Sequence, residues 1–159
     1  MPVEADGLAA RLLEGGRTVA RLARQVEVAL QPLELTLSQY RVLCALEAGA
    51  EASSSLAEKL AVSAPSVTTV VDGLVARRLV DRSHDSGPDR RRVSISITAA
   101  GAAIADQARS SVAQRLAEVA SHLSSLEEAR RAVECLALWA HALDLERDEK
   151  RGERQAAAR

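Results

Sequence analysis

Hydrophobic residues near the N-terminus recur every three or four positions, with one step of seven, which is typical of one face of an amphipathic helix. The pattern runs from about Gly7 to Gln31, where Pro32 stops the helix because proline has no amide hydrogen to donate. A second helix is predicted over about 37–48. Thr36 and Gln39 are spaced as a capping box at its start, and Gly49 follows as a C-cap.

Two short helices follow in the pattern. The first is predicted over about 53–60, after a run of serines and with Leu56 and Leu60 on its apolar face. The second begins at Ala64–Pro65, with Ser63 as its N-cap and proline in the first turn, where a missing amide hydrogen costs nothing. Its expected buried face consists of Val67, Val70, Val71, Leu74 and Val75.

After Arg78 the apolar period changes from helical spacing to two. Residues 79–83 form one candidate strand, and residues 92–97 alternate strictly between polar and apolar side chains, which predicts a strand with one buried face. The intervening segment, 84–91, is rich in charge and in turn-forming residues. The sequence therefore predicts a two-stranded hairpin with a basic tip.

Two long helices complete the pattern. Thr98 is placed to cap a helix reaching about Leu123, and Ser125 with Glu128 forms a candidate capping box for the last helix. That last helix has a heptad-like seam, spaced 3, 4, 3, 4, 3, made of Leu126, Ala129, Val133, Leu136, Ala140 and Leu143. The expected organisation is a helix in 1–34, a central domain in 35–98, helices in 99–148 and a flexible tail in 149–159.

Composition narrows the classes of protein. The chain is 47% hydrophobic and 27% charged, a balance typical of folded domains, and Tyr40 and Trp139 are its only aromatic residues. A platform that stacks unpaired bases on aromatic rings is therefore not expected. No apolar run is long enough for a membrane span, no signal peptide is indicated, and two cysteines make no disulfide framework, so a cytoplasmic location is predicted.

Charge is unevenly distributed although the net charge is only −1. Residues 64–92 carry six arginines and four aspartates, and arginine offers a planar fork suited to phosphates and guanine edges. The order of the predicted elements is that of a winged helix-turn-helix: a helix, a short helix, a Ser-capped helix and then a hairpin with a basic tip. A helix entering the major groove needs short polar side chains at its N-terminal end, and a neighbouring arginine can reach the minor groove.

Several motifs together resemble the MarR family of bacterial transcription regulators. They are residues 35–43 (LTLSQYRVL), 56–63 (LAEKLAVS), Val67–Thr68 through Val71–Leu74, Asp89–Arg91, and Ile97–Thr98 with Gly101. The resemblance implies a mainly α fold with a small β-hairpin wing, a winged helix-turn-helix joined to a helical dimerisation domain. It also implies an obligate homodimer on palindromic double-stranded DNA, usually a repressor relieved by a small molecule or an oxidant.

The candidate DNA-binding residues come from the helix that Ser63 caps and from the hairpin. They are Ser63, Pro65, Ser66, Thr68, Thr69, His84, Arg90, Arg91 and Arg92, with Asp72 and Asp89 as residues that orient the wing. The resemblance places Arg91 in the minor groove. Three positions depart from the family pattern: Thr69 and Gly73 stand where arginine is frequent, and Arg78 stands where a capping glycine is usual, so it either adopts the left-handed conformation or the helix ends differently.

Alternatives remain open at this point. Cys44 or Cys135 could serve a thiol-based redox sensor, although Cys44 fits a core position and Cys135 has no evident basic neighbour. A helical interaction protein without DNA affinity would explain the long helices but not the basic hairpin. No catalytic motif, metal-ligand spacing or cofactor motif is present, so neither an enzyme nor a metal site is expected. Tyr40 is the one candidate ligand-binding residue.

Overall fold

The structure is a computed structural model that describes residues 2–49, 51–84 and 93–157. The chain divides into two compact units, residues 1–116 and 117–159. The first unit contains the helix-turn-helix elements and a small sheet. The second contains the end of one long helix and the whole of the last one.

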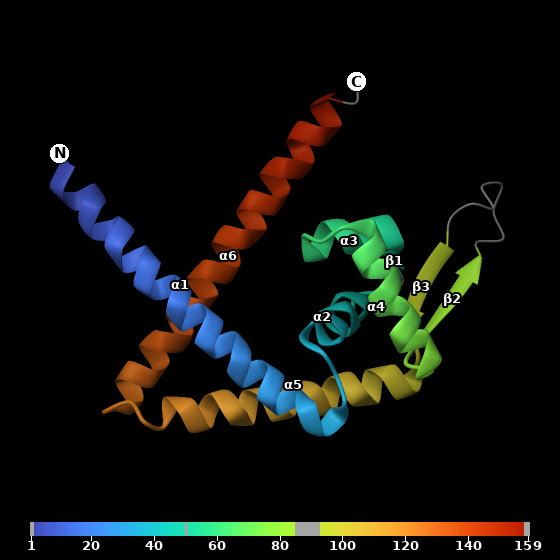
Figure 1. The fold of residues 1–159 in the computed structure, drawn as a ribbon, viewed down its shortest axis with the longest axis horizontal. Coiled ribbons are helices and arrows are strands. Elements are labelled where there is room, and N and C mark those ends of the chain that lie inside the picture. The colour runs from blue at the N-terminus through green and yellow to red at the C-terminus, as the bar shows by residue number, and fades with distance from the viewer. Residues whose placement is uncertain (1, 50, 85–92, 158–159) are drawn as a thin grey trace. The chain divides into compact units, whose positions relative to one another are not determined.

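Helices dominate the fold, which also contains three short strands (Figure 1). The elements are α1 (Pro2–Leu30), the 3₁₀ turn η1 (Gln31–Leu33), α2 (Leu37–Leu46), β1 (Glu51–Ala52), α3 (Ser53–Leu60), α4 (Ala64–Ala76), β2 (Val80–His84), β3 (Val93–Ile97), α5 (Ala99–Ala120) and α6 (Leu126–Ala157). The predicted fold class, mainly α with a small β-hairpin wing, is confirmed.

Side-chain caps fix where the helices begin. Thr36 accepts a hydrogen bond from the backbone N–H of Gln39, and the Gln39 side chain accepts one from the N–H of Thr36, which completes the predicted capping box. Ser63 caps α4 by accepting from Ser66 N at 3.3 Å. Thr98 accepts from Gly101 N at 2.9 Å at the start of α5. Each cap supplies a partner to an amide that the first helical turn leaves unpaired.

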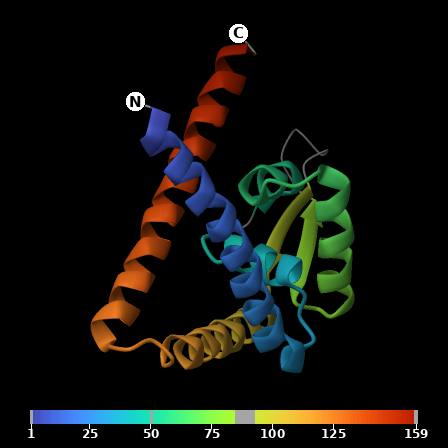
Figure 2. The same ribbon diagram turned by 60° about the vertical axis from the view of Figure 1, so that its left-hand side comes forward.

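The sheet is antiparallel, with strand order β1-β3-β2. Val80 pairs with Ile97 and Arg82 with Ile95, so the predicted hairpin pairs residue by residue up to His84 and Val93. β1 was not predicted: Glu51 pairs with Ile95 from the other edge, and two residues are too few to show an alternating pattern. Figure 2 shows β2 and β3 beside α4.

One hydrophobic core holds the first unit together. It is formed by Leu30, Leu35, Val42, Leu43, Leu46, Leu56, Val67, Val71, Leu74, Leu79, Val80, Ile95, Ala105 and Ala108. These residues come mainly from the end of α1, from helices α2, α3 and α4, from the sheet and from α5. The core therefore fixes α4 against both the sheet and the helices that precede it.

In the second unit the break between α5 and α6 lies where it was predicted, and α6 is longer than predicted. Ser125 accepts from Glu128 N at 3.2 Å as a cap. The Glu128 carboxylate accepts from the N–H and hydroxyl of Ser124 instead of reaching back to Ser125, so the predicted capping box is shifted by one residue on that side. α6 continues to Ala157, beyond the point where the sequence pattern suggested a tail.

Among the described residues, none of the helices by itself has the length and apolar character needed to cross a membrane. Only α3 and α4 taken as a pair bent by 109° meet that criterion.

Candidate nucleic-acid interface

The outer face of α4 gathers the helix residues predicted to contact DNA. Val67, Val71 and Leu74 are buried in the core. The predicted residues Ser63, Pro65, Ser66, Thr68 and Thr69 are all exposed and lie at the N-terminal end of the same helix. The fold thus presents a continuous surface of small side chains there.

Hydroxyl groups on this face already have partners within α4. Thr68 Oγ1 donates to Ala64 O at 3.1 Å, and Thr69 Oγ1 donates to Pro65 O at 3.2 Å. The Ser63 and Ser66 hydroxyls lie 2.7 Å apart and share a hydrogen bond. These bonds order the side chains before any partner arrives.

An ion pair joins α4 to the hairpin. Arg82 on β2 lies 2.5 Å from the Asp72 carboxylate and also donates to Thr68 O at 3.4 Å. Asp72 was predicted to orient the wing, and its ion-pair partner, Arg82, lies on a strand of that wing. Sequence reasoning did not single out Arg82, whose only signal was its place in the arginine-rich segment. The contact links the helix to the strand at a partly exposed position.

The C-terminal end of α4 is tied down by backbone acceptors. Arg77 donates to Glu34 O at 2.6 Å and to Leu33 O at 3.0 Å, which links α4 to the segment before α2. Arg78 has φ 58°, so it adopts the left-handed conformation in place of the usual glycine.

Thr98 and Gly101 then connect this turn to α5. The Thr98 amide donates to Leu79 O at 3.1 Å, and its hydroxyl lies 2.9 Å from Arg78 O. A Cβ atom on Gly101 would lie 1.9 Å from Leu79 O, so only glycine allows this approach. The turn after α4 is therefore held by both flanking helices.

Several predicted site residues are not placed by the structure. Asp89, Arg90, Arg91 and Arg92 lie outside the described residues. His84 is the last residue of β2, and its side chain is likewise not described. Their proposed roles stay predictions.

Tyr40 and Cys44 are neighbours on α2, and both are half-buried. Burial and the adjacent Cys44 raise the pKa of Tyr40 to about 12. Burial also raises the pKa of the Cys44 thiol, although a hydrogen bond with Tyr40 opposes the shift. A raised pKa disfavours the thiolate, which is the reactive form, so the structure gives no support to Cys44 as a redox sensor. Cys135 is exposed on α6.

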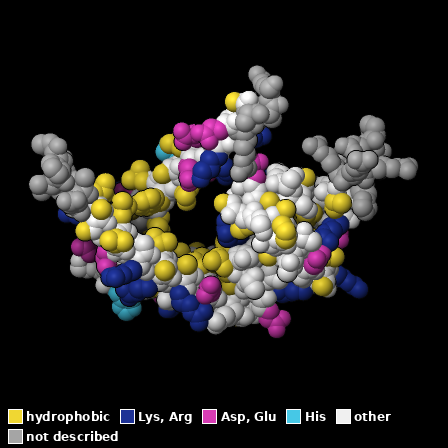
Figure 3. Space-filling view, turned by 45° about the horizontal axis from the view of Figure 1, so that its top comes forward, with side chains coloured by type: hydrophobic (Ala, Val, Ile, Leu, Met, Phe, Trp, Pro, Cys, Tyr) yellow, Lys and Arg dark blue, Asp and Glu magenta, His cyan; other side chains and the backbone are white. Residues whose placement is uncertain are grey.

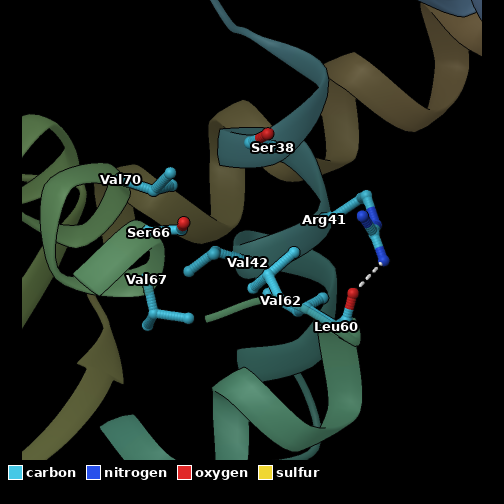
Figure 4. A pocket seen from close by; sticks show the side chains of 8 residues that line it. All are labelled: Ser38, Arg41, Val42, Leu60, Val62, Ser66, Val67 and Val70. Atoms are coloured by element: carbon cyan, nitrogen blue, oxygen red, sulfur yellow. Dashed lines mark hydrogen bonds between the residues drawn. The ribbon is translucent and has the colours of Figure 1, made fainter. Parts of the chain in front are cut away.

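A small pocket lies between α2, α3 and α4, close to the exposed face (Figure 4). Its cavity volume is only about 40 Å³, and it has a largely apolar lining that includes Val42, Val62 and Val67. Arg41 stands at its edge and donates to Leu60 O at 2.6 Å. Tyr40 does not line this pocket. No group of three or more potential metal ligands occurs among the described residues.

These elements define a winged helix-turn-helix protein: α3 and α4 form the helix-turn-helix, and β2 and β3 form the wing. A model of the MarR family matches residues 33–92. Among curated proteins, the multiple antibiotic resistance protein MarR of Escherichia coli is 34% identical over 88 residues, covering 55% of this chain and 60% of that protein. The transcriptional repressor NicR of Pseudomonas putida is 39% identical over 74 residues, 46% of each chain.

Solved structures agree over a longer stretch. The apo form of E. coli MarR superposes with a TM-score of 0.69 at 27% identity, covering 80% of this chain and 93% of that one. In both sequence and fold, the chain resembles the MarR family. Its matches span 46% to 64% of the length of the curated relatives. Proteins of this family are transcription regulators and not enzymes, in agreement with the prediction from sequence.

Proposed function

We propose that this chain is a transcription regulator that binds a pseudo-palindromic site in double-stranded DNA as a homodimer. The observation that carries the proposal is the exposed, small and polar N-terminal face of α4, which the Asp72–Arg82 ion pair joins to a two-stranded hairpin. A helix of this kind enters the major groove with its N-terminal residues against the base edges. The hairpin then lies over the neighbouring phosphates and minor groove.

A second copy of the chain is the proposed partner of the long helices. Large hydrophobic side chains are exposed in α1 (Leu8, Leu12, Leu13, Val19) and in α6 (Leu126, Val133, Leu136, Leu138, Trp139, Leu143, Leu145). Such side chains are visible as yellow patches on the face drawn in Figure 3. Obligate dimers bury on the order of 2,000–5,000 Å² of mainly apolar surface. We therefore expect the dimer to have no stable folded monomer.

The relatives support this proposal. One solved structure holds a mutant of E. coli MarR in complex with operator DNA, with 26% identity to this chain over 82% of its length. NicR is named a repressor, and the DNA binding of Bordetella bronchiseptica BpsR is described as regulated by 6-hydroxynicotinic acid. By analogy we propose a repressor in the cytoplasm that responds to a small molecule, for which Tyr40 remains a candidate contact.

Binding to duplex DNA is the direct test. Operators are selected from a pool of random duplexes, and affinity is measured by gel shift and fluorescence anisotropy. The expected footprint exceeds ~15 bp, with half-sites about 10 bp apart on one face of the helix. Equal affinity for single strands, or no duplex binding by the dimer, would contradict the proposal and favour a helical interaction protein.

Arg91→Ala tests the wing. Arginine gains most in a narrow minor groove, where the potential is most negative, so the variant is expected to lose about 1–3 kcal/mol of DNA binding. The salt dependence should flatten by about one phosphate-equivalent per subunit. Arg151→Ala, at an exposed position of α6, is the matched control and should bind like the parent protein. Unchanged affinity and salt slope in Arg91→Ala would contradict the role.

A further inference from the structure

We propose that Thr68 and Thr69 of α4 read A·T base pairs in the major groove, and that α4 offers no arginine or lysine to read guanine. The inference rests on the proposed function, since it assigns the base preference of that same DNA-binding face. It follows from which hydrogen-bonding groups of α4 remain available.

The first observation is the absence of long donors on α4. The helix contains no Arg, Lys, Asn or Gln between Ala64 and Ala76. Its only charged side chain is Asp72, which Arg82 neutralises at 2.5 Å. Guanine presents two acceptors, N7 and O6, in the major groove and is usually read by a long donor such as arginine. Nothing on α4 supplies that donor.

At position 73 a larger residue fits only if the Gln39 side chain shifts. A Cβ atom on Gly73 would lie 3.2 Å from Gln39 Nε2. Gln39 is itself committed to the capping box, because its side-chain oxygen accepts from Thr36 N at 3.0 Å. Glycine at position 73 therefore leaves room for the Gln39 side chain that caps α2.

The second observation concerns the threonine hydroxyls. A hydroxyl has one hydrogen to donate and two lone pairs that accept. The hydrogens of Thr68 and Thr69 are used by Ala64 O and Pro65 O. Both side chains are exposed, so what they offer to DNA is acceptor capacity. The donors in the major groove are the adenine N6 and cytosine N4 amino groups.

Apolar surface decides between adenine and cytosine. Each threonine also carries a γ-methyl group, and Ala64 and Pro65 are exposed beside it. An A·T pair places the thymine methyl group next to the adenine amino group, whereas a G·C pair has no methyl group in the groove. Acceptors combined with methyl groups therefore match A·T pairs.

The experiment uses base analogues in an operator selected with the full-length dimer. Thymine is replaced by uracil, which lacks the methyl group, and adenine by nebularine, which lacks the N6 amino group. Guanine is replaced by 7-deazaguanine, which lacks N7. Under α4 we expect uracil to weaken binding about fourfold, the value of one buried methyl group. Nebularine should weaken it about three- to tenfold, as for one hydrogen bond, and 7-deazaguanine should have no effect.

Two conservative variants assign the effects to the threonines. Thr69→Val keeps the shape but removes the acceptor, so it should abolish the nebularine effect at its base pair. Thr69→Ser keeps the acceptor but removes the γ-methyl group, so it should abolish the uracil effect. The same pair of substitutions at Thr68 tests the neighbouring base pair. Both variants should retain the parent melting temperature, because residue 69 is exposed.

The outcomes separate this inference from the proposed function. Failure to bind any duplex would overturn the proposed function. Specific binding that is weakened by 7-deazaguanine and unaffected by uracil and nebularine would overturn the A·T assignment and leave the regulator proposal standing. Analogue effects that persist unchanged in the Thr68 and Thr69 variants would also overturn the assignment to these residues.

Discussion

Burial of hydrophobic side chains differs between two regions with similar residues: the winged helix segment, residues 31–98, and the long terminal helices. In the first region Leu43, Leu56, Leu74 and Ile95 are fully buried. In α6, Leu126 is 87% exposed. Among the described residues, Val62 is the only large exposed hydrophobic side chain that falls within 31–98. One region buries its hydrophobic side chains within the chain, and the other leaves them exposed in the single chain, where the proposed dimer covers them.

The difference has an energetic consequence. Burying one leucine or valine side chain contributes about 1.5–3 kcal/mol. The winged helix segment gains this within one chain, whereas α6 gains it only through association. Substitutions in the winged helix segment should therefore act on the free energy of unfolding itself. Substitutions in α6 should act mainly on dimer association, and so on how that stability depends on protein concentration.

Gly101→Ala is expected to have the largest effect. Its Cβ would lie 1.9 Å from Leu79 O and 2.9 Å from Ile97 Cγ1, and backbone atoms cannot move aside. We expect a loss of about 3–5 kcal/mol in the free energy of unfolding, measured by urea titration. Gly152→Ala is the control, because nothing lies within 4 Å of the added atom. It should gain about 0.5–1 kcal/mol from better helix propensity. Equal stability of the two variants would contradict the close approach.

Leu136→Asp should come next, and it tests the other region. Leu136 lies on the α6 seam and is 48% exposed in the single chain. A buried charge at a dimer contact typically costs 2 kcal/mol or more, so the dissociation constant should rise at least about 30-fold. Analytical ultracentrifugation measures it. Arg130→Asp adds the same side chain at an exposed position outside the seam and should leave the dimer intact. A Leu136→Asp dimer as tight as the parent would exclude this face as the interface.

Sequence patterns predicted the winged helix segment almost element by element, because caps and periodicity act locally. Thr36, Ser63 and Thr98 cap the helices they were expected to cap. What the patterns missed depends on pairing across the fold. β1 is defined only by its register with β3, and the Asp72–Arg82 pair joins a helix to a strand, so no single period relates the two residues.

The reason for glycine at position 101 was also not predictable from sequence. The resemblance supplied the motif, but only the distance to Leu79 O explains it. Similarly, the left-handed conformation of Arg78 was one of two alternatives until the structure gave its φ angle. The roles of the α4 hydroxyls depend on hydrogen-bond partners that the residue types alone do not specify.

Arg78→Gly should stabilise the winged helix segment. A non-glycine residue in the left-handed conformation carries a cost of about 1 kcal/mol, which glycine avoids. The melting temperature should therefore rise. Arg77→Gly is the matched control at the preceding residue. That arginine has φ −88° and donates to Leu33 O and Glu34 O, so its loss should lower the melting temperature. A lower melting temperature for Arg78→Gly would show that the Arg78 side chain stabilises the fold by more than the left-handed conformation costs.

The smallest effect is expected at the edge strand β1. The Glu51 carboxylate accepts hydrogen bonds from Lys59 and from the Ser55 hydroxyl, the latter at 2.5 Å. These bonds, the one from Lys59 first, hold the pKa of Glu51 below its ordinary value. A pKa that is lower in the folded than in the unfolded chain stabilises the fold at neutral pH. That contribution is lost as the pH falls below about 4.3, the unfolded value, and through the lower folded value.

Glu51→Gln should therefore be less stable than the parent at pH 7, and by less than about 1 kcal/mol because the pair is partly exposed. The difference between the two proteins should shrink in urea titrations as the pH is lowered through the acidic range. Lys59→Met provides the control background, in which the main partner is absent and Glu51→Gln should cost less at pH 7. A difference that stays constant with pH would mean that Glu51 stabilises β1 by packing and not by charge.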